Sequence, residues 1–257
     1  MRVTLAVLVA AVLWGQAFAE PVAWPDGRRA AVVLTYDDAM SSQLDNAIPA
    51  HDAAGLKGTF FLTGAVKPQD IVRWRAAAAE GHELGNHTLF HPCARGTYPM
   101  AERATAESYT VDTMLGEIAT MNTLLTAIDG KMSHAMATPC GNTKAGGADY
   151  IEPLRQSGLT KYVRGVGWQN GAIDPMNAPS HWFDTNTTGD DLIAAVKDAE
   201  RAHGLLIFGF HGVGGNNMIV TAEAHAALLA YLKAHQDTIW VAPFSLVMDY
   251  VTAHPGP

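Results

Sequence analysis

Short apolar runs alternate along the chain with longer stretches in which apolar positions recur every three or four residues. The first pattern is typical of buried strands, and the second is typical of helices packed against them. Strands are predicted at residues 30–36, 58–62, 82–86, 134–138, 161–166, 205–210 and 239–242. Helices are predicted at residues 43–54, 69–80, 101–128, 149–157, 190–203 and 221–235. The repeated strand and helix units favour an α/β fold with about seven parallel strands.

Residues 167–188 follow neither period and contain Gly, Asn, Pro, Ser and Trp, which indicates a long loop. No internal repeat, low-complexity tract or Ser/Gly linker divides the chain. Single α/β barrels commonly reach about 250 residues. Residues 20–257 are therefore predicted to form one domain.

Residues 1–19 have the pattern of a signal peptide. Arg2 provides the basic start, residues 3–14 are largely apolar, and Ala17 and Ala19 provide the small residues before a cleavage site. The apolar run is shorter than the roughly 20 residues needed to span a bilayer, so removal is favoured over anchoring. We therefore expect a secreted or periplasmic protein with no membrane span after signal removal.

The composition indicates a well-buried globular protein, because 48% of the residues are hydrophobic and 16% are charged. The formal net charge of −8 becomes −9 when Arg2 is removed with the signal peptide. Such an acidic chain is poorly suited to nucleic acid or anionic lipid, which attract Lys and Arg. A neutral or cationic carbohydrate is compatible with this charge, and the oligomeric state stays open.

Two adjacent acids, Asp37 and Asp38, follow the first predicted strand. The carboxyl ends of strands are where α/β barrels present catalytic groups. Adjacent residues of a strand point to opposite sides, so one carboxylate can hold a metal while the other handles a proton. Acids are also frequent in turns and helix caps, so the pair alone does not establish a site.

His87 and His91 are four residues apart, about one helical turn, so both imidazoles can face one point. No acid stands between them, and the pair alone is also compatible with surface or core histidines. Together with Asp38 they supply three ligands and leave positions open, as expected for a catalytic divalent metal. Zinc suits this set best, and cobalt, nickel or manganese are alternatives.

Four segments resemble the motifs of the polysaccharide deacetylases, carbohydrate esterase family four. They are Thr35-Tyr36-Asp37-Asp38, His87-Thr88-Leu89-Phe90-His91, Thr138-Pro139-Cys140-Gly141 and Phe210-His211-Gly212. The resemblance covers nearly the whole chain after the signal peptide and implies a distorted (β/α) barrel. It implies that Asp37 is the general base, that Asp38, His87 and His91 bind the metal, and that His211 is the general acid. A structural histidine at a barrel end is the other interpretation of His211.

The resemblance also identifies candidates for the rest of the site. A backbone N–H near Cys140 is expected to stabilise an oxyanion, and Tyr36, Pro139 and Trp168 are candidates for substrate contacts. His181 and Trp182 are further aromatic candidates, although core packing is the usual role of such residues.

The chain departs from the family pattern at two places. The usual arginine, two positions before the proline of the third motif, is Ala137 here. Arg164, at a later strand end, is a candidate replacement partner for Asp37, and an ordinary structural salt bridge is the other interpretation. The fourth motif, an acid and a tryptophan, is not clearly present between Trp168 and Asp184.

Cys93 and Cys140 are the two cysteines of the chain. Export would allow a disulfide, but their spacing alone does not pair them. The resemblance places both at the same rim of the barrel, so we expect a disulfide between them. Two free buried thiols are the alternative.

The expected activity is metal-dependent hydrolysis of N- or O-linked acetyl groups on a polysaccharide or oligosaccharide. A catalytically weakened glycan-binding module is one alternative, because the usual arginine is replaced by Ala137. An iron oxygenase with two histidines and one carboxylate is another, but such sites usually occur in antiparallel barrels.

Overall fold

A closed barrel of parallel strands forms the centre of the protein in the computed structural model, which describes residues 22–167, 172–216 and 218–254. The strand order is β12-β1-β2-β3-β4-β7-β8-β9, and pairing of β1 with β9 closes a ring of seven strands. The strands are β1 (Ala30–Asp37), β2 (Thr59–Leu62), β3 (Glu83–Asn86), β4 (Met136–Ala137), β7 (Val163–Val166), β8 (Ala178–Trp182), β9 (Leu205–Phe210) and β12 (Ile239–Val241). The predicted (β/α) barrel is confirmed.

Strand β8 corrects the prediction of a continuous loop at residues 167–188. It pairs with β7 and β9 and completes the ring, whereas β12 lies outside the ring beside the first half of β1. Two short pairs lie outside the main sheet: β5 (Lys144–Ala145) with β6 (Ala148–Asp149), and β10 (Gly212–Val213) with β11 (Ile219–Val220).

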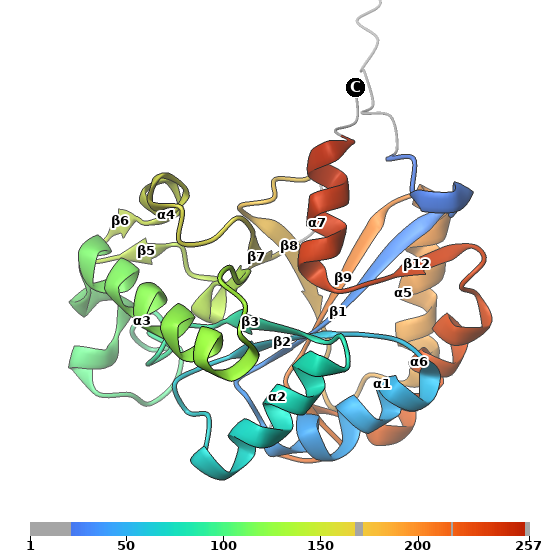
Figure 1. Cartoon of the computed structure of the whole chain (residues 1–257), viewed down its shortest axis with the longest axis horizontal. Coiled ribbons are helices and arrows are strands. Elements are labelled where there is room, and N and C mark those ends of the chain that lie inside the picture. Colours follow the sequence, from blue (N-terminus) through green and yellow to red (C-terminus); the bar gives the residue numbers. More distant parts are fainter. Residues whose placement is uncertain (1–21, 168–171, 217, 255–257) are drawn as a thin grey trace, which may run out of the picture.

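Helices surround the strands (Figure 1). They are α1 (Ile48–Ala54), α2 (Ile71–Ala79), α3 (Val111–Asp129), α4 (Ile151–Ser157), α5 (Gly189–Ala202), α6 (Ala222–Ala234) and α7 (Phe244–Ala253). Helix α3 begins later than predicted, because the Thr110 side chain accepts a hydrogen bond from the N–H of Thr113 and caps it there. Helix α7 was not predicted. None of the helices in the described part of the chain is long and apolar enough to cross a membrane.

Alternating residues of β1 belong to two different cores. Val32, Leu34 and Tyr36 pack toward the surrounding helices, whereas Ala31 and Val33 belong to a separate inner core. Because side chains alternate along a strand, Asp37 lies on the inner side with Ala31 and Val33. The strand therefore carries its catalytic candidate toward the barrel axis.

Helix α7 closes the amino-terminal end of the barrel. Its apolar residues pack within the inner core, and its first N–H group, that of Phe244, donates to Thr59 Oγ1 at 2.8 Å. Thr59 donates in turn to Glu83, which also accepts a hydrogen bond from the N–H of Ser245 at 3.0 Å. The predicted site residues are therefore at the opposite, carboxyl end of the strands.

Candidate active site

The turn after β1 places both acids at the carboxyl end of the barrel. Asp37 is the last residue of the strand, and Asp38 and Ala39 follow with φ of 77° and 53°. Positive φ is uncommon for residues other than glycine and is most often retained at functional sites. This sharp turn gives the two adjacent carboxylates different surroundings: Asp37 is buried, and Asp38 is 25% exposed.

The three predicted metal ligands lie together. The distance from Asp38 Oδ1 to His87 Nε2 is 3.8 Å and to His91 Nε2 is 3.7 Å, and the two Nε2 atoms are 3.1 Å apart. Two nitrogen ligands of a tetrahedral zinc ion, at about 2.0–2.1 Å from it, lie roughly 3.3 Å apart. The three donor atoms therefore fit around one divalent cation.

A hydrogen bond at Nδ1 of His87 leaves its Nε2 free to bind a metal. Its Nδ1–H donates to the carbonyl of Ala137 at 2.9 Å, which leaves Nε2 with the lone pair. Burial lowers the pKa of His87, but the negative charges of Asp37 and Asp38 raise it overall. Burial and the neighbouring His87 lower the pKa of His91 to about 4, so His91 is neutral near pH 7.

The two histidines do not share a helical turn, which corrects the local structure expected from their spacing. Residues 87–91 form a loop in which Thr88 and His91 have φ of 63° and 53°. Asn86 Oδ1 accepts from the N–H of Thr88 at 2.8 Å, and Thr88 Oγ1 accepts from the N–H of His91 at 3.1 Å. Side chains that bond to the nearby backbone favour such turns over helices.

Asp37 is held by a buried arginine. Arg164 Nη2 donates to Asp37 Oδ2 at 2.5 Å, and His87 Nε2 lies 3.2 Å from the same oxygen. Burial raises the pKa of Asp37, but the charges of Arg164 and His87 outweigh this and hold the pKa well below its usual range. The other oxygen, Oδ1, is buried without a hydrogen-bond partner among the described residues.

Arg164 is a buried residue of the strand next to the one that carries Ala137. It lies on β7 directly beside Ala137 of β4, in parallel register. Its guanidinium lies between the rings of Phe61 and Trp182, at 5.2 and 5.0 Å from the centroids, and donates to Ser180 at 3.0 Å. These contacts fix the planar cation against the carboxylate.

His211 directly follows β9 and also approaches Asp38. Its Nε2 lies 3.8 Å from Asp38 Oδ2, and its ring packs at 4.5 Å from the ring of Trp182. Burial lowers the pKa of His211, and the charges of Asp37 and Asp38 partly oppose this.

Gln43 is a functional candidate that sequence reasoning missed. Its buried side-chain amide donates to the carbonyl of Asp37 at 2.5 Å and to the carbonyl of His211 at 3.0 Å. It begins a π-helical turn, Gln43–Ala47, of a kind frequently found at functional sites. No sequence motif indicated Gln43, because a glutamine within a predicted helix carries no distinctive signal of function.

The predicted disulfide between Cys93 and Cys140 is present, with their Cα atoms 5.6 Å apart. Cys140 has φ of 53° within the turn Pro139–Gly141, and Pro139 beside it is buried. Cys93 Sγ lies 3.5 Å from His91 Nδ1. The disulfide therefore joins the loop that carries His91 to the loop that follows β4.

Tyr36 is not available to a substrate, which corrects the prediction made for it. The residue is fully buried, and its hydroxyl hydrogen-bonds to His51 Nε2 at 2.8 Å and His225 Nε2 at 2.6 Å. Alternation along β1 turns it away from Asp37 and toward α1 and α6. Trp168 lies outside the described residues.

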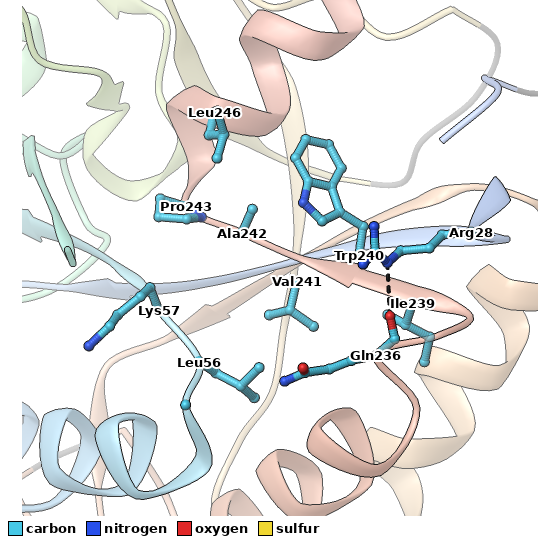
Figure 2. Close-up of a pocket in the computed structure, with 11 residues that line it drawn as sticks. Arg28, Leu56, Lys57, Gln236, Ile239, Trp240, Val241, Ala242, Pro243 and Leu246 are labelled. Atoms are coloured by element: carbon cyan, nitrogen blue, oxygen red, sulfur yellow. Dashed lines mark hydrogen bonds between the residues drawn. The ribbon is translucent and has the colours of Figure 1, made fainter. Parts of the chain in front are cut away.

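A pocket elsewhere on the barrel contains none of the predicted site residues (Figure 2). It lies against β12, where Arg28 Nε donates to the carbonyl of Gln236 at 2.8 Å. Its two cations, Arg28 and Lys57, are already paired with Asp26 and Asp52. This pocket is therefore separate from the candidate active site.

The family is shown by comparison with known proteins. Residues 25–160, more than half of the chain, match the family model described as polysaccharide deacetylase, so the chain belongs to the polysaccharide deacetylase family. A gellan lyase from Bacillus sp is 24% identical over 260 residues, which cover 90% of this chain and 10% of that protein. The chain thus spans about a tenth of the length of this curated relative.

Solved structures of a polysaccharide deacetylase and of family 4 carbohydrate esterases share the fold. A candidate polysaccharide deacetylase from Mycobacterium smegmatis superposes with a TM-score of 0.68 at 20% identity, covering 91% of this chain and 94% of that one. A family 4 acetyl xylan esterase from Clostridium thermocellum, in complex with cobalt, gives 0.57 at 19% identity, covering 88% and 93%. A family 4 pseudoenzyme from Bacillus anthracis gives 0.57 at 16% identity, covering 88% and 67%.

Proposed function

We propose that the protein is a metal-dependent hydrolase that removes acetyl groups from a polysaccharide or oligosaccharide. The observation that carries the proposal is the environment of the Asp37 carboxylate. One oxygen is bonded to Arg164, and the other is buried without a partner among the described residues. An ionised carboxylate with one oxygen free of protein partners is placed to accept a proton beside a metal site.

Asp38, His87 and His91 would hold the metal, because their donor atoms fit around one cation. When bound, a divalent ion supplies Lewis-acid activation of water and polarisation of the acetyl carbonyl. Zinc best matches two imidazoles and a carboxylate, and cobalt, nickel and manganese suit the same ligands.

The side chains around these ligands would divide the proton transfers. Asp37 accepts a proton from the attacking water through Oδ1, and Arg164 keeps this carboxylate ionised and oriented. His211 donates a proton to the departing amine or alcohol, and the backbone N–H of Cys140 donates to the oxyanion. Each proton transfer contributes about 10²- to 10⁴-fold to the rate.

The main alternative is a glycan-binding module with little turnover, since a family 4 pseudoenzyme shares the fold. In the sequence, the reason to consider this alternative is that Ala137 stands where the family usually has an arginine. The 2.5 Å contact between Arg164 and Asp37 supports catalysis instead, because the base retains a cationic partner from the neighbouring strand.

The place of action is also part of the proposal. We infer that residues 1–19 are removed as a signal peptide and that residues 20–257 act outside the cytoplasm as one domain. The acidic net charge suits a neutral or cationic carbohydrate better than a polyanion.

Acetate release from a panel of N- and O-acetylated glycans tests the proposal. Zinc-loaded protein is compared with Asp37→Asn, His87→Ala and the control Asp198→Asn, whose exposed carboxylate lies on α5 in an ion pair with Arg201. We expect Asp37→Asn to lose activity but keep zinc, and His87→Ala to lose both. Zinc-loaded protein that releases no acetate from the whole panel would point to the binding module.

A further inference from the structure

His91 presents its two ring nitrogens to different groups. Nε2 faces His87 and Asp38, whereas Nδ1 lies 3.5 Å from Cys93 Sγ of the disulfide. His91 Nδ1 and the sulfurs of Cys93 and Cys140 lie within 4.8 Å of one another. The disulfide therefore holds two sulfur atoms beside a nitrogen donor atom, and reduction would turn these sulfurs into soft metal ligands.

One distance between these atoms already fits a metal site with thiolate ligands, and the other requires the disulfide to open. With Zn–N at about 2.05 Å and Zn–S at about 2.3 Å, tetrahedral geometry separates nitrogen and sulfur by roughly 3.6 Å. The observed distance of 3.5 Å from His91 Nδ1 to Cys93 Sγ already matches this. The two sulfurs would need to part from about 2 Å to roughly 3.7 Å. Cys140 is exposed, so its side chain has room to rotate outward once the bond is broken.

We propose that reduction of the Cys93–Cys140 disulfide creates a second metal site, formed by His91 Nδ1 and two thiolates. A dithiol reductant gives two electrons and two protons to the disulfide, becomes a disulfide itself and leaves two thiols on the protein. A thiophilic divalent cation then displaces the two thiol protons. Thiolate ligands favour zinc and other soft ions over magnesium or calcium.

The new site competes with the proposed catalytic one, and this part rests on the proposed function. A neutral imidazole has one nitrogen with a lone pair, and the other nitrogen carries the proton. When His91 Nδ1 binds the thiolate-held ion, Nε2 is protonated and cannot join His87 and Asp38. While the disulfide is intact, Nε2 of His91 is therefore available to the catalytic ligand set. Cys93 Sγ can then accept a hydrogen bond from the Nδ1–H of His91.

Cobalt binding provides the test, because thiolate-bound Co²⁺ has intense near-ultraviolet charge-transfer absorption that nitrogen and oxygen ligands lack. The oxidised protein, the protein reduced with dithiothreitol and desalted without oxygen, and the Cys93→Ser/Cys140→Ser variant are titrated with CoCl₂. We expect this absorption in the reduced protein alone. A folded reduced protein without it would overturn the proposal, as would a reduced chain whose circular dichroism shows unfolding.

Two further variants assign the third ligand. In reduced His91→Gln the Kd for Co²⁺ should rise about 10-fold or more, because even changes beside a ligand cost 10- to 100-fold. In reduced His87→Ala the absorption should be unchanged, since His87 belongs to the other site. An unchanged Kd in His91→Gln would refute the role of His91. The readout is independent of acetate release, so the proposed function and this site can fail separately.

Discussion

Replacing Arg164 with methionine removes the positive charge that faces Asp37 at 2.5 Å. Both side chains are almost completely buried, at 1% and 3% exposure, so neither charge is solvated by bulk water. Loss of one partner from a buried ion pair costs about 3–5 kcal/mol, because the other charge stays uncompensated. Methionine retains an apolar chain between Phe61 and Trp182, so the loss of packing contributes little.

The pH dependence separates this charge effect from a packing defect. The folded-state pKa of Asp37 is below its unfolded value of about 3.9. Its contribution to stability is therefore present above about pH 4 and is lost as the pH falls toward the folded pKa. The stability difference between wild type and Arg164→Met should shrink by about 1 kcal/mol between pH 7 and pH 3.

Urea unfolding in the presence of a chelator measures both quantities. Arg201→Met, at an exposed position of α5, is the matched control and should change the free energy of unfolding by less than about 0.5 kcal/mol. Arg164→Met within that same range at pH 7 would refute the reasoning. Adding Ala137→Arg to Arg164→Ala should restore part of the stability and activity, because residues 137 and 164 are in register on adjacent strands.

Three other changes test separate parts of the structure. Cys93→Ser/Cys140→Ser should lower the free energy of urea unfolding by about 4 kcal/mol, because the disulfide closes a loop with a sequence separation of 47; equal stability would contradict this. Burial lowers the pKa of His225 to about 4, so unfolding takes up protons below pH 6.5. Wild type should thus lose about 2 kcal/mol between pH 7 and pH 5 from this residue. His225→Gln should reduce that loss, and an identical pH profile would argue against it. Gln43→Leu should lower kcat about 100-fold with KM and bound metal unchanged, because it frees the carbonyls of Asp37 and His211.

Most of the fold could be predicted because its strands are short runs of buried residues. Strand β8 was missed because its residues are Ala, Pro, Ser, His and Trp, which lack the β-branched pattern of its neighbours. Pro179, which has no N–H to donate, pairs with Gly165 of β7 and precedes the residues His181 and Trp182 that pair with β9. Helix α7 was missed although its buried residues Phe244, Val247, Met248 and Val251 recur at helical spacing, because Leu246 adds an apolar residue on the exposed side.

The candidate site was predictable where the motif residues sit at strand ends, as with Asp37 and His211. The side to which Tyr36 points followed from simple alternation with Asp37, although its position in a motif suggested otherwise. Contacts between distant segments were predictable only where the resemblance supplied them. It suggested the pair of Arg164 with Asp37, 127 positions apart, whereas no sequence signal marked the bond of Gln43 to His211 across 168 positions.

The closure of the barrel by β9 and α7 has a consequence for how the chain acquires its structure. The longest pairing of β1 is with β9. Residues 31–36 therefore cannot form this pairing until residues 205–210 have been synthesised. The inner core gains its cover only when Phe244 and the rest of α7 arrive. Such non-local pairing makes folding slow and leaves early strands unprotected. Until the last segment has been synthesised, the inner core therefore lacks this cover, and its exposed apolar residues are prone to aggregate.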